Sequence, residues 1–103
     1  MEIIKRLTER IHEEIEDMEG YAKFAIEVKQ SHPMLAHTLY SIALQEEEHQ
    51  AKIHEQVVKI IEQYRRDHGA PPPEMLAVYN FLHRKAIEEL AEARRYIEIY
   101  KEQ

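Results

Sequence analysis

The chain has 103 residues, the size of one small domain covering residues 1–103, and its net charge is −6. A domain this small often gains stability by association, so we expect a homo-oligomer of at least two chains. The sequence lacks cysteine, which excludes disulfides and thiolate metal sites, so a bound metal ion would need carboxylate and imidazole ligands. The acidic balance argues against a nucleic-acid partner. With no apolar leader or membrane-length apolar run, we expect a cytoplasmic protein with no membrane partner.

The first predicted element is a helix over residues 2–30. Apolar residues recur along it at intervals of three or four, at Ile4, Leu7, Ile11, Met18, Tyr21, Ala25 and Val28. Glu14 is the only charged residue on this stripe. A rotation of the helix would instead turn Glu16 or Asp17 inward, so these two acids remain alternatives to Glu14.

The second predicted helix covers residues 33–68, and Gly69 is expected to take a positive φ after its end. Its apolar stripe runs through Leu35, Leu39, Ile42, Ile53, Val57, Ile60 and Tyr64. Glu46 and His49 interrupt this stripe. An unpaired carboxylate costs several kcal/mol when it leaves water, so the pair predicts either a metal site or a polar network whose members satisfy one another.

A short turn near Pro33 predicts that the first two helices form an antiparallel hairpin. At a rise of about 1.5 Å per residue, Glu14 then lies level with Glu46 and His49. We therefore predict that these three side chains share one layer of the bundle and act as metal ligands.

The third predicted helix covers residues 73–102, and the short link before it predicts that it folds back beside the second helix or swings to another subunit. Glu89 lies on one apolar stripe of this helix and off another, so its burial is ambiguous. Glu9 and His12 repeat the Glu-x-x-His spacing, which we ascribe to chance in so acidic a chain. The remaining histidines are expected at the surface or the core edge; they are His32, His37, His54, His68 and His83.

Glu14 followed by Tyr21, and then by Glu46-x-x-His49 on the next helix, resembles the first half of the ferritin-like family, which includes rubrerythrins, bacterioferritins and encapsulated ferritins. The resemblance covers residues 10–60. It implies a four-helix bundle with two irons, in which Glu14 is a bridging or terminal ligand, Glu46 a bridging ligand and His49 a terminal ligand. By the same resemblance, Tyr21 is a hydrogen-bond donor behind the ligands.

The chain departs from this family because it has no fourth helix and no further Glu-x-x-His beyond Glu46-x-x-His49. The resemblance therefore implies an all-α half-bundle of three antiparallel helices, completed by a two-fold dimer with a di-iron site at its interface. The implied function is oxidation of Fe(II), a ferroxidase activity, or a manganese or zinc site with the same ligands. The alternative is a non-enzymatic helical oligomerisation protein whose Glu and His residues form a structural polar network.

Overall fold

The computed structural model describes residues 2–103, which form three long α-helices joined by two short links. Helix α1 spans Glu2–Val28, α2 spans Pro33–His68 and α3 spans Pro73–Glu102, and this part of the chain contains no strand. The bounds of α2 and α3 agree with the sequence-based prediction, whereas α1 ends at Val28 rather than at residue 30. The molecule is a rod of 56 × 19 × 18 Å. None of the three helices is long and apolar enough to cross a membrane.

Proline and glycine set the helix bounds. Pro33 and Pro73 are the first residues of α2 and α3, where a missing N–H costs nothing and a fixed φ favours the helix. α2 ends at Gly69, whose φ of 81° and ψ of −158° suit glycine almost alone, and whose N–H donates to the Arg65 carbonyl at 3.0 Å. In the α1–α2 turn, the His32 N–H donates to the Val28 carbonyl at 2.7 Å.

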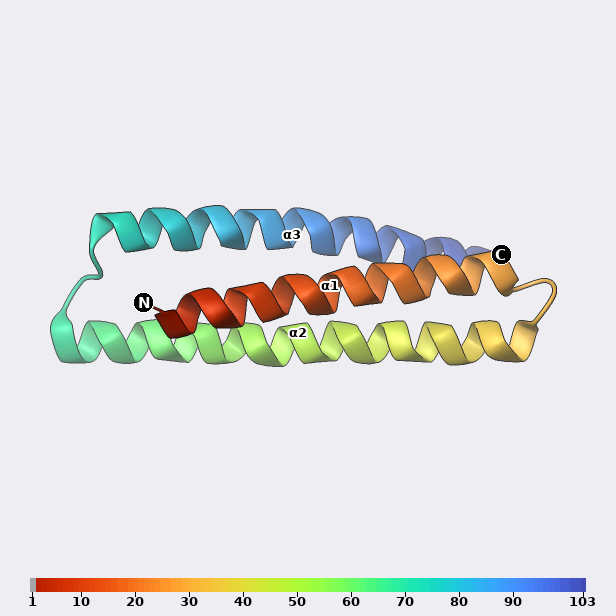
Figure 1. Cartoon of the computed structure of the whole chain (residues 1–103), viewed down its shortest axis with the longest axis horizontal. Coiled ribbons are helices and arrows are strands. Elements are labelled where there is room, and N and C mark those ends of the chain that lie inside the picture. Colours follow the sequence, from red (N-terminus) through yellow and green to blue (C-terminus); the bar gives the residue numbers. More distant parts are fainter. Residues whose placement is uncertain (1) are drawn as a thin grey trace.

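Helix α1 lies between α2 and α3 and packs along both (Figure 1). The backbones of α2 and α3 approach each other at few points, and these two helices meet mainly through side chains, such as the stacked rings of Tyr40 and Tyr100. Helix α3 thus folds back as predicted, but it packs mainly against α1. The reason is that the buried stripe of α1 is wide enough to pack against two helices. Its buried residues are Ile4, Thr8, Ile11, Ile15, Met18, Ala22 and Ala25.

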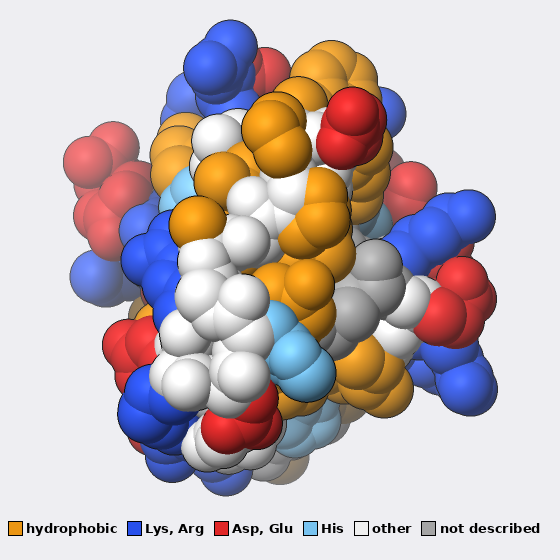
Figure 2. Space-filling model, turned by 90° about the vertical axis from the view of Figure 1, so that its left-hand side faces the viewer, with side chains coloured by type: hydrophobic (Ala, Val, Ile, Leu, Met, Phe, Trp, Pro, Cys, Tyr) orange, Lys and Arg blue, Asp and Glu red, His pale blue; other side chains and the backbone are white. Residues whose placement is uncertain are grey.

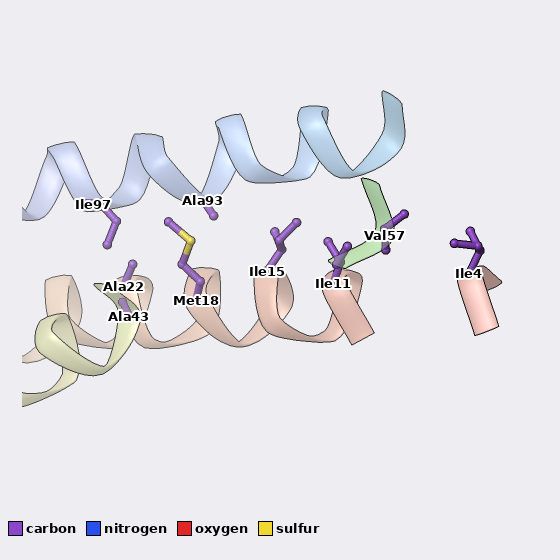
Figure 3. Packing of buried hydrophobic residues seen from close by; sticks show 9 residues of the cluster. All are labelled: Ile4, Ile11, Ile15, Met18, Ala22, Ala43, Val57, Ala93 and Ile97. Carbon is purple, nitrogen blue, oxygen red and sulfur yellow. The ribbon is translucent and has the colours of Figure 1, made fainter. Parts of the chain in front are cut away.

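The core consists of aliphatic side chains from α1 that meet smaller ones from its neighbours. Figure 3 shows Ile15 and Met18 pointing from α1 toward α3, and Ala93 and Ile97 pointing back. Ile15 and Met18 are almost completely buried, and full burial of such a side chain contributes about 1.5–3 kcal/mol. This core fixes α1 as the central helix of the bundle.

The C-terminal end of α3 is fastened to the α1–α2 turn. The Lys29 ammonium donates to the carbonyl oxygens of Tyr100 and Gln103 at 2.5 and 2.6 Å, at the C-terminal end of α3. The Tyr40 and Tyr100 rings stack with centroids 4.6 Å apart. Figure 2 views the opposite end of the bundle, which carries the α2–α3 link, and shows apolar side chains gathered between charged ones.

Candidate metal centre

Glu14 of α1 meets Glu46 and His49 of α2 in one layer, as the antiparallel hairpin predicts. One ligand atom from each of the three side chains lies within 4.8 Å of the other two. His49 Nδ1 is 3.4 Å from Glu14 Oε2 and 3.8 Å from Glu46 Oε2. The glutamates come from different helices, so this arrangement depends on the register of the hairpin.

The layer is less buried than the sequence predicts. The side chains of Glu14 and Glu46 are 24% and 17% exposed, but that of His49 is 52% exposed. The reason is a rotation of α2: Leu39 and Val57 of the predicted stripe are buried, but the other buried residues of this helix, Ala36, Ala43 and Gln50, lie beside that stripe. His49 therefore lies at the edge of the α1–α2 interface and not in the core.

The layer opens on the flank of the hairpin opposite α3. His12 hydrogen-bonds to Glu89 of α3, and two residues along a helix are about 200° of rotation, so Glu14 faces nearly the other way. Half-buried apolar residues lie at helical spacing before and after the layer; they are Leu7, Tyr21, Val28, Ile42, Ile53 and Ile60. We call these six residues with the Glu–His layer the outer face. A polar cluster thus lies within an apolar strip that α3 leaves uncovered.

The pKa of Glu46 is raised to about 7. The main cause is a hydrogen bond with Glu14 that favours the protonated carboxyl group, followed by burial and by the negative charge of Glu14. His49 opposes this shift, and Asp17 adds to it. Glu46 is therefore partly protonated near neutral pH.

Four other residues were candidates for the layer or its surroundings. Glu16 and Asp17 are exposed, so neither replaces Glu14 in the layer. Tyr21 is half-buried and packs against both core clusters, and no hydrogen bond from it to the layer is present in residues 2–103. Glu89 does not join the layer, because its Oε2 lies 2.9 Å from His12 Nδ1 on the other flank of α1.

Two contacts made by histidines were not predicted from the sequence. His12, whose spacing from Glu9 is ascribed to chance, hydrogen-bonds to Glu89 and so ties α1 to α3. His54 and His83, expected at the surface or core edge, stack across α2 and α3 with ring centroids 5.0 Å apart. The ambiguous stripe of Glu89 is the only sequence signal that points to either contact.

The donor set fits a divalent cation. Carboxylate oxygen and imidazole nitrogen suit iron, manganese and zinc, and a cation could replace the proton on Glu46. Among residues 2–103 the cluster has three ligands, and the exposed side of His49 leaves room for more. The fold and the cluster together define a three-helix protein with a candidate carboxylate–histidine metal site. Comparisons with protein-family models, curated proteins and solved structures find no match to this chain.

Proposed function

We propose that this protein binds iron at Glu14, Glu46 and His49 and oxidises Fe(II), with two chains completing a di-iron site. The convergence of the three ligand atoms within 4.8 Å carries this proposal. Two carboxylates and an imidazole from each of two chains make four carboxylates and two imidazoles, the set that ferritin-like di-iron proteins use.

The outer face supports a symmetric dimer. It combines half-buried apolar side chains with a site that has ligands on one side only, and a second copy of the same face would cover both at once. Burial of the apolar strip would supply the association energy. The ligands of the second chain would then close the open side of the layer.

Each residue has a defined part in the proposed chemistry. Glu14 and Glu46 would bind Fe(II) with hard oxygen ligands once Glu46 has lost its proton, and His49 would supply a nitrogen ligand. Two Fe(II) ions give up one electron each, and O₂ takes two electrons and two protons from solvent to form hydrogen peroxide. The net charge of −6 attracts Fe(II) over long range, an effect that salt weakens.

A structural polar network is the second candidate, and one observation favours it. The Glu14–Glu46 hydrogen bond and the 3.4 Å contact between His49 and Glu14 satisfy the three side chains without an ion. Such a layer would fix the register of an oligomer and would bind no metal tightly.

An anaerobic Fe(II) titration of the purified chain, with its mass in solution measured in parallel, tests the proposal. We expect saturation at about two irons per dimer and, on admission of air, uptake of about one O₂ for each two Fe(II). His49→Ala should abolish tight uptake. His37→Ala is the matched control, because His37 is an exposed histidine of the same helix outside the layer.

Each contrary result has its own meaning. Absence of saturable uptake by the native chain contradicts the metal site and favours the polar network. Saturable binding of Fe(II), Mn(II) or Zn(II) without O₂ consumption contradicts the oxidase activity and leaves a metal-binding protein with the same ligands.

A further inference from the structure

A cavity of about 210 Å³ lies between the three helices, on the side of α1 away from the Glu–His layer. It exists because α3 packs mainly against α1 and its backbone approaches α2 at few points. Ile11 of α1, Val57 of α2 and Leu90 of α3 form apolar parts of its wall. For comparison, an apolar cavity of about 150 Å³ holds one benzene molecule, so this space accommodates one ring with a small substituent.

Gln50 is the buried polar residue that the core does not explain. Ala43, Gln50 and Val57 follow one another at seven-residue spacing on the buried stripe of α2, and Gln50 is the polar member of this series. Gln50 is only 8% exposed and lines the cavity. Its amide forms no hydrogen bond with any other described residue, and its oxygen and nitrogen are not among the buried atoms that lack a partner, so they are reachable by a small molecule. The amide can therefore offer a donor and an acceptor to a ligand in the cavity.

One side of the cavity is a wall of stacked rings. His83 of α3 stacks on His54 of α2 at 5.0 Å and on Tyr79 of α3 at 5.6 Å, with interplanar angles of 20° and 12°. All three residues line the cavity. Ring edges and faces of this kind favour an aromatic neighbour over an aliphatic one.

The cavity offers no charge to a ligand. No Asp, Glu, Lys or Arg is among the described residues that line it. Burial, aided by the neighbouring His83, lowers the pKa of His54 and so favours its neutral form. His54 Nε2 is itself buried without a hydrogen-bond partner in residues 2–103. An ionic ligand would lose its hydration here without gaining a counter-charge.

We infer that the cavity binds a small neutral phenol, whose ring lies against Tyr79, His83 and His54 and whose hydroxyl group pairs with the Gln50 amide. A hydroxyl group supplies one donor and also accepts, which matches the carbonyl oxygen and the NH₂ group of Gln50. The site lies apart from the Glu–His layer, so this inference does not rest on the proposed iron chemistry.

The test is a titration of the ¹⁵N-labelled chain, without added metal and near neutral pH, followed by ¹H–¹⁵N NMR spectra. Three probes separate the features of the cavity. Phenol carries the hydroxyl group, toluene replaces it with a methyl group of similar size, and benzoate carries a charge. We expect saturable shifts with phenol, including those of the Gln50 side-chain amide, about five- to tenfold weaker binding of toluene, and no binding of benzoate.

Two variants locate the site. Gln50→Leu should remove the preference for phenol over toluene, because it replaces the amide with an aliphatic group of similar volume. Ala51→Phe should block both ligands, since Ala51 is exposed at the rim and lines the cavity. Ala91→Phe is the control, because Ala91 is an exposed alanine of α3 outside the lining. Far-UV circular dichroism shows whether each variant folds.

Absence of saturable phenol shifts in the native chain overturns the inference and leaves the cavity as solvent space. The inference is also overturned if Gln50→Leu prefers phenol over toluene as strongly as the native chain does. The amide would then have no part in binding. Neither result bears on iron uptake by the Glu–His layer, which the Fe(II) titration measures separately.

Discussion

Glu46 lies beside Glu14 across the α1–α2 interface, and a hydrogen bond with Glu14 is the main cause that raises the pKa of Glu46 to about 7. The ordinary pKa of the group is 4.5. In the metal-free protein, folding therefore brings together two carboxyl groups that resist simultaneous ionisation. The layer is electrostatically unfavourable at neutral pH until a proton or a cation lies between the two glutamates.

The first prediction concerns stability and pH. Below pH 4.5 Glu46 is protonated in both states; between pH 4.5 and about 7 only the unfolded chain loses the proton, so stability falls as pH rises. Above about pH 7 the free energy of unfolding has fallen by its full amount, about 1–2 kcal/mol after allowance for solvent screening. Glu46→Gln should lose this dependence and exceed the native chain in stability above neutral pH by the same amount. Urea unfolding at several pH values measures the free energy of unfolding of the native chain and of Glu46→Gln.

Glu48→Gln is the matched control for this measurement, because Glu48 is exposed on the same helix. It should leave the pH profile unchanged. If Glu46→Gln were the less stable protein above neutral pH, the two glutamates would not repel each other as described.

The second prediction concerns metal affinity and pH. A cation at the layer must displace the proton of Glu46, so the apparent affinity for Mn(II) should rise with pH and level off above about 7. The expected slope below that value is about tenfold per pH unit, corresponding to one proton. Calorimetric titration in two buffers of different ionisation enthalpy measures the proton released. An affinity independent of pH would show that Glu46 is not a ligand.

The third prediction concerns the His12–Glu89 contact between α1 and α3. Glu89→Ala removes the partner of His12 Nδ1, and His12 Nε2 is already buried without one in the described chain. We expect a loss of about 1–2 kcal/mol in the free energy of unfolding, because the buried imidazole is left with no hydrogen bond. Fe(II) uptake should be unchanged, because Glu89 lies on the flank away from the layer. A loss of uptake with intact stability would instead place Glu89 in the metal site.

The helices and the layer could be predicted from the sequence because their causes are local. Pro33, Gly69 and Pro73 mark helix bounds within a chain that has few other breakers. The register of a tight antiparallel hairpin then follows from the helical rise alone. Glu14 accordingly lies beside His49, although the residues are 35 positions apart.

The rotation of α2 could not be predicted in the same way. Its predicted stripe contains large aliphatic residues such as Ile42 and Ile53, whereas the buried stripe includes Ala36, Ala43 and Gln50. Small residues carry a weak hydropathy signal, yet they are favoured where helices approach closely. The position of α3 on α1, and the cavity that results, depend on contacts between three helices that no local spacing encodes.

The fourth prediction compares the two glycines. Gly20 is exposed within α1, and a methyl group added there would meet nothing within 4 Å, so Gly20→Ala should stabilise the chain by about 0.5–1 kcal/mol. Gly69 also has open space around it but a φ of +81°, so Gly69→Ala should destabilise the chain by about 1 kcal/mol or more. Thermal unfolding measures the stability of both variants. A stabilised Gly69→Ala would mean that α2 ends in another conformation.

The fifth prediction concerns association through the outer face. Leu35 is 43% exposed and shares the helical spacing of Ile42 and Glu46 on α2, so a symmetric contact would bury it further. Leu35→Glu should weaken dimerisation at least tenfold by placing an unpaired charge in that contact, and should weaken Fe(II) uptake with it. Met34→Glu is the control, because Met34 is adjacent but 86% exposed and off the stripe. Sedimentation equilibrium measures the mass of each variant. Equal dimerisation of the two variants would mean that the chains meet through another surface, and Glu14, Glu46 and His49 would then have to bind metal without a symmetric partner.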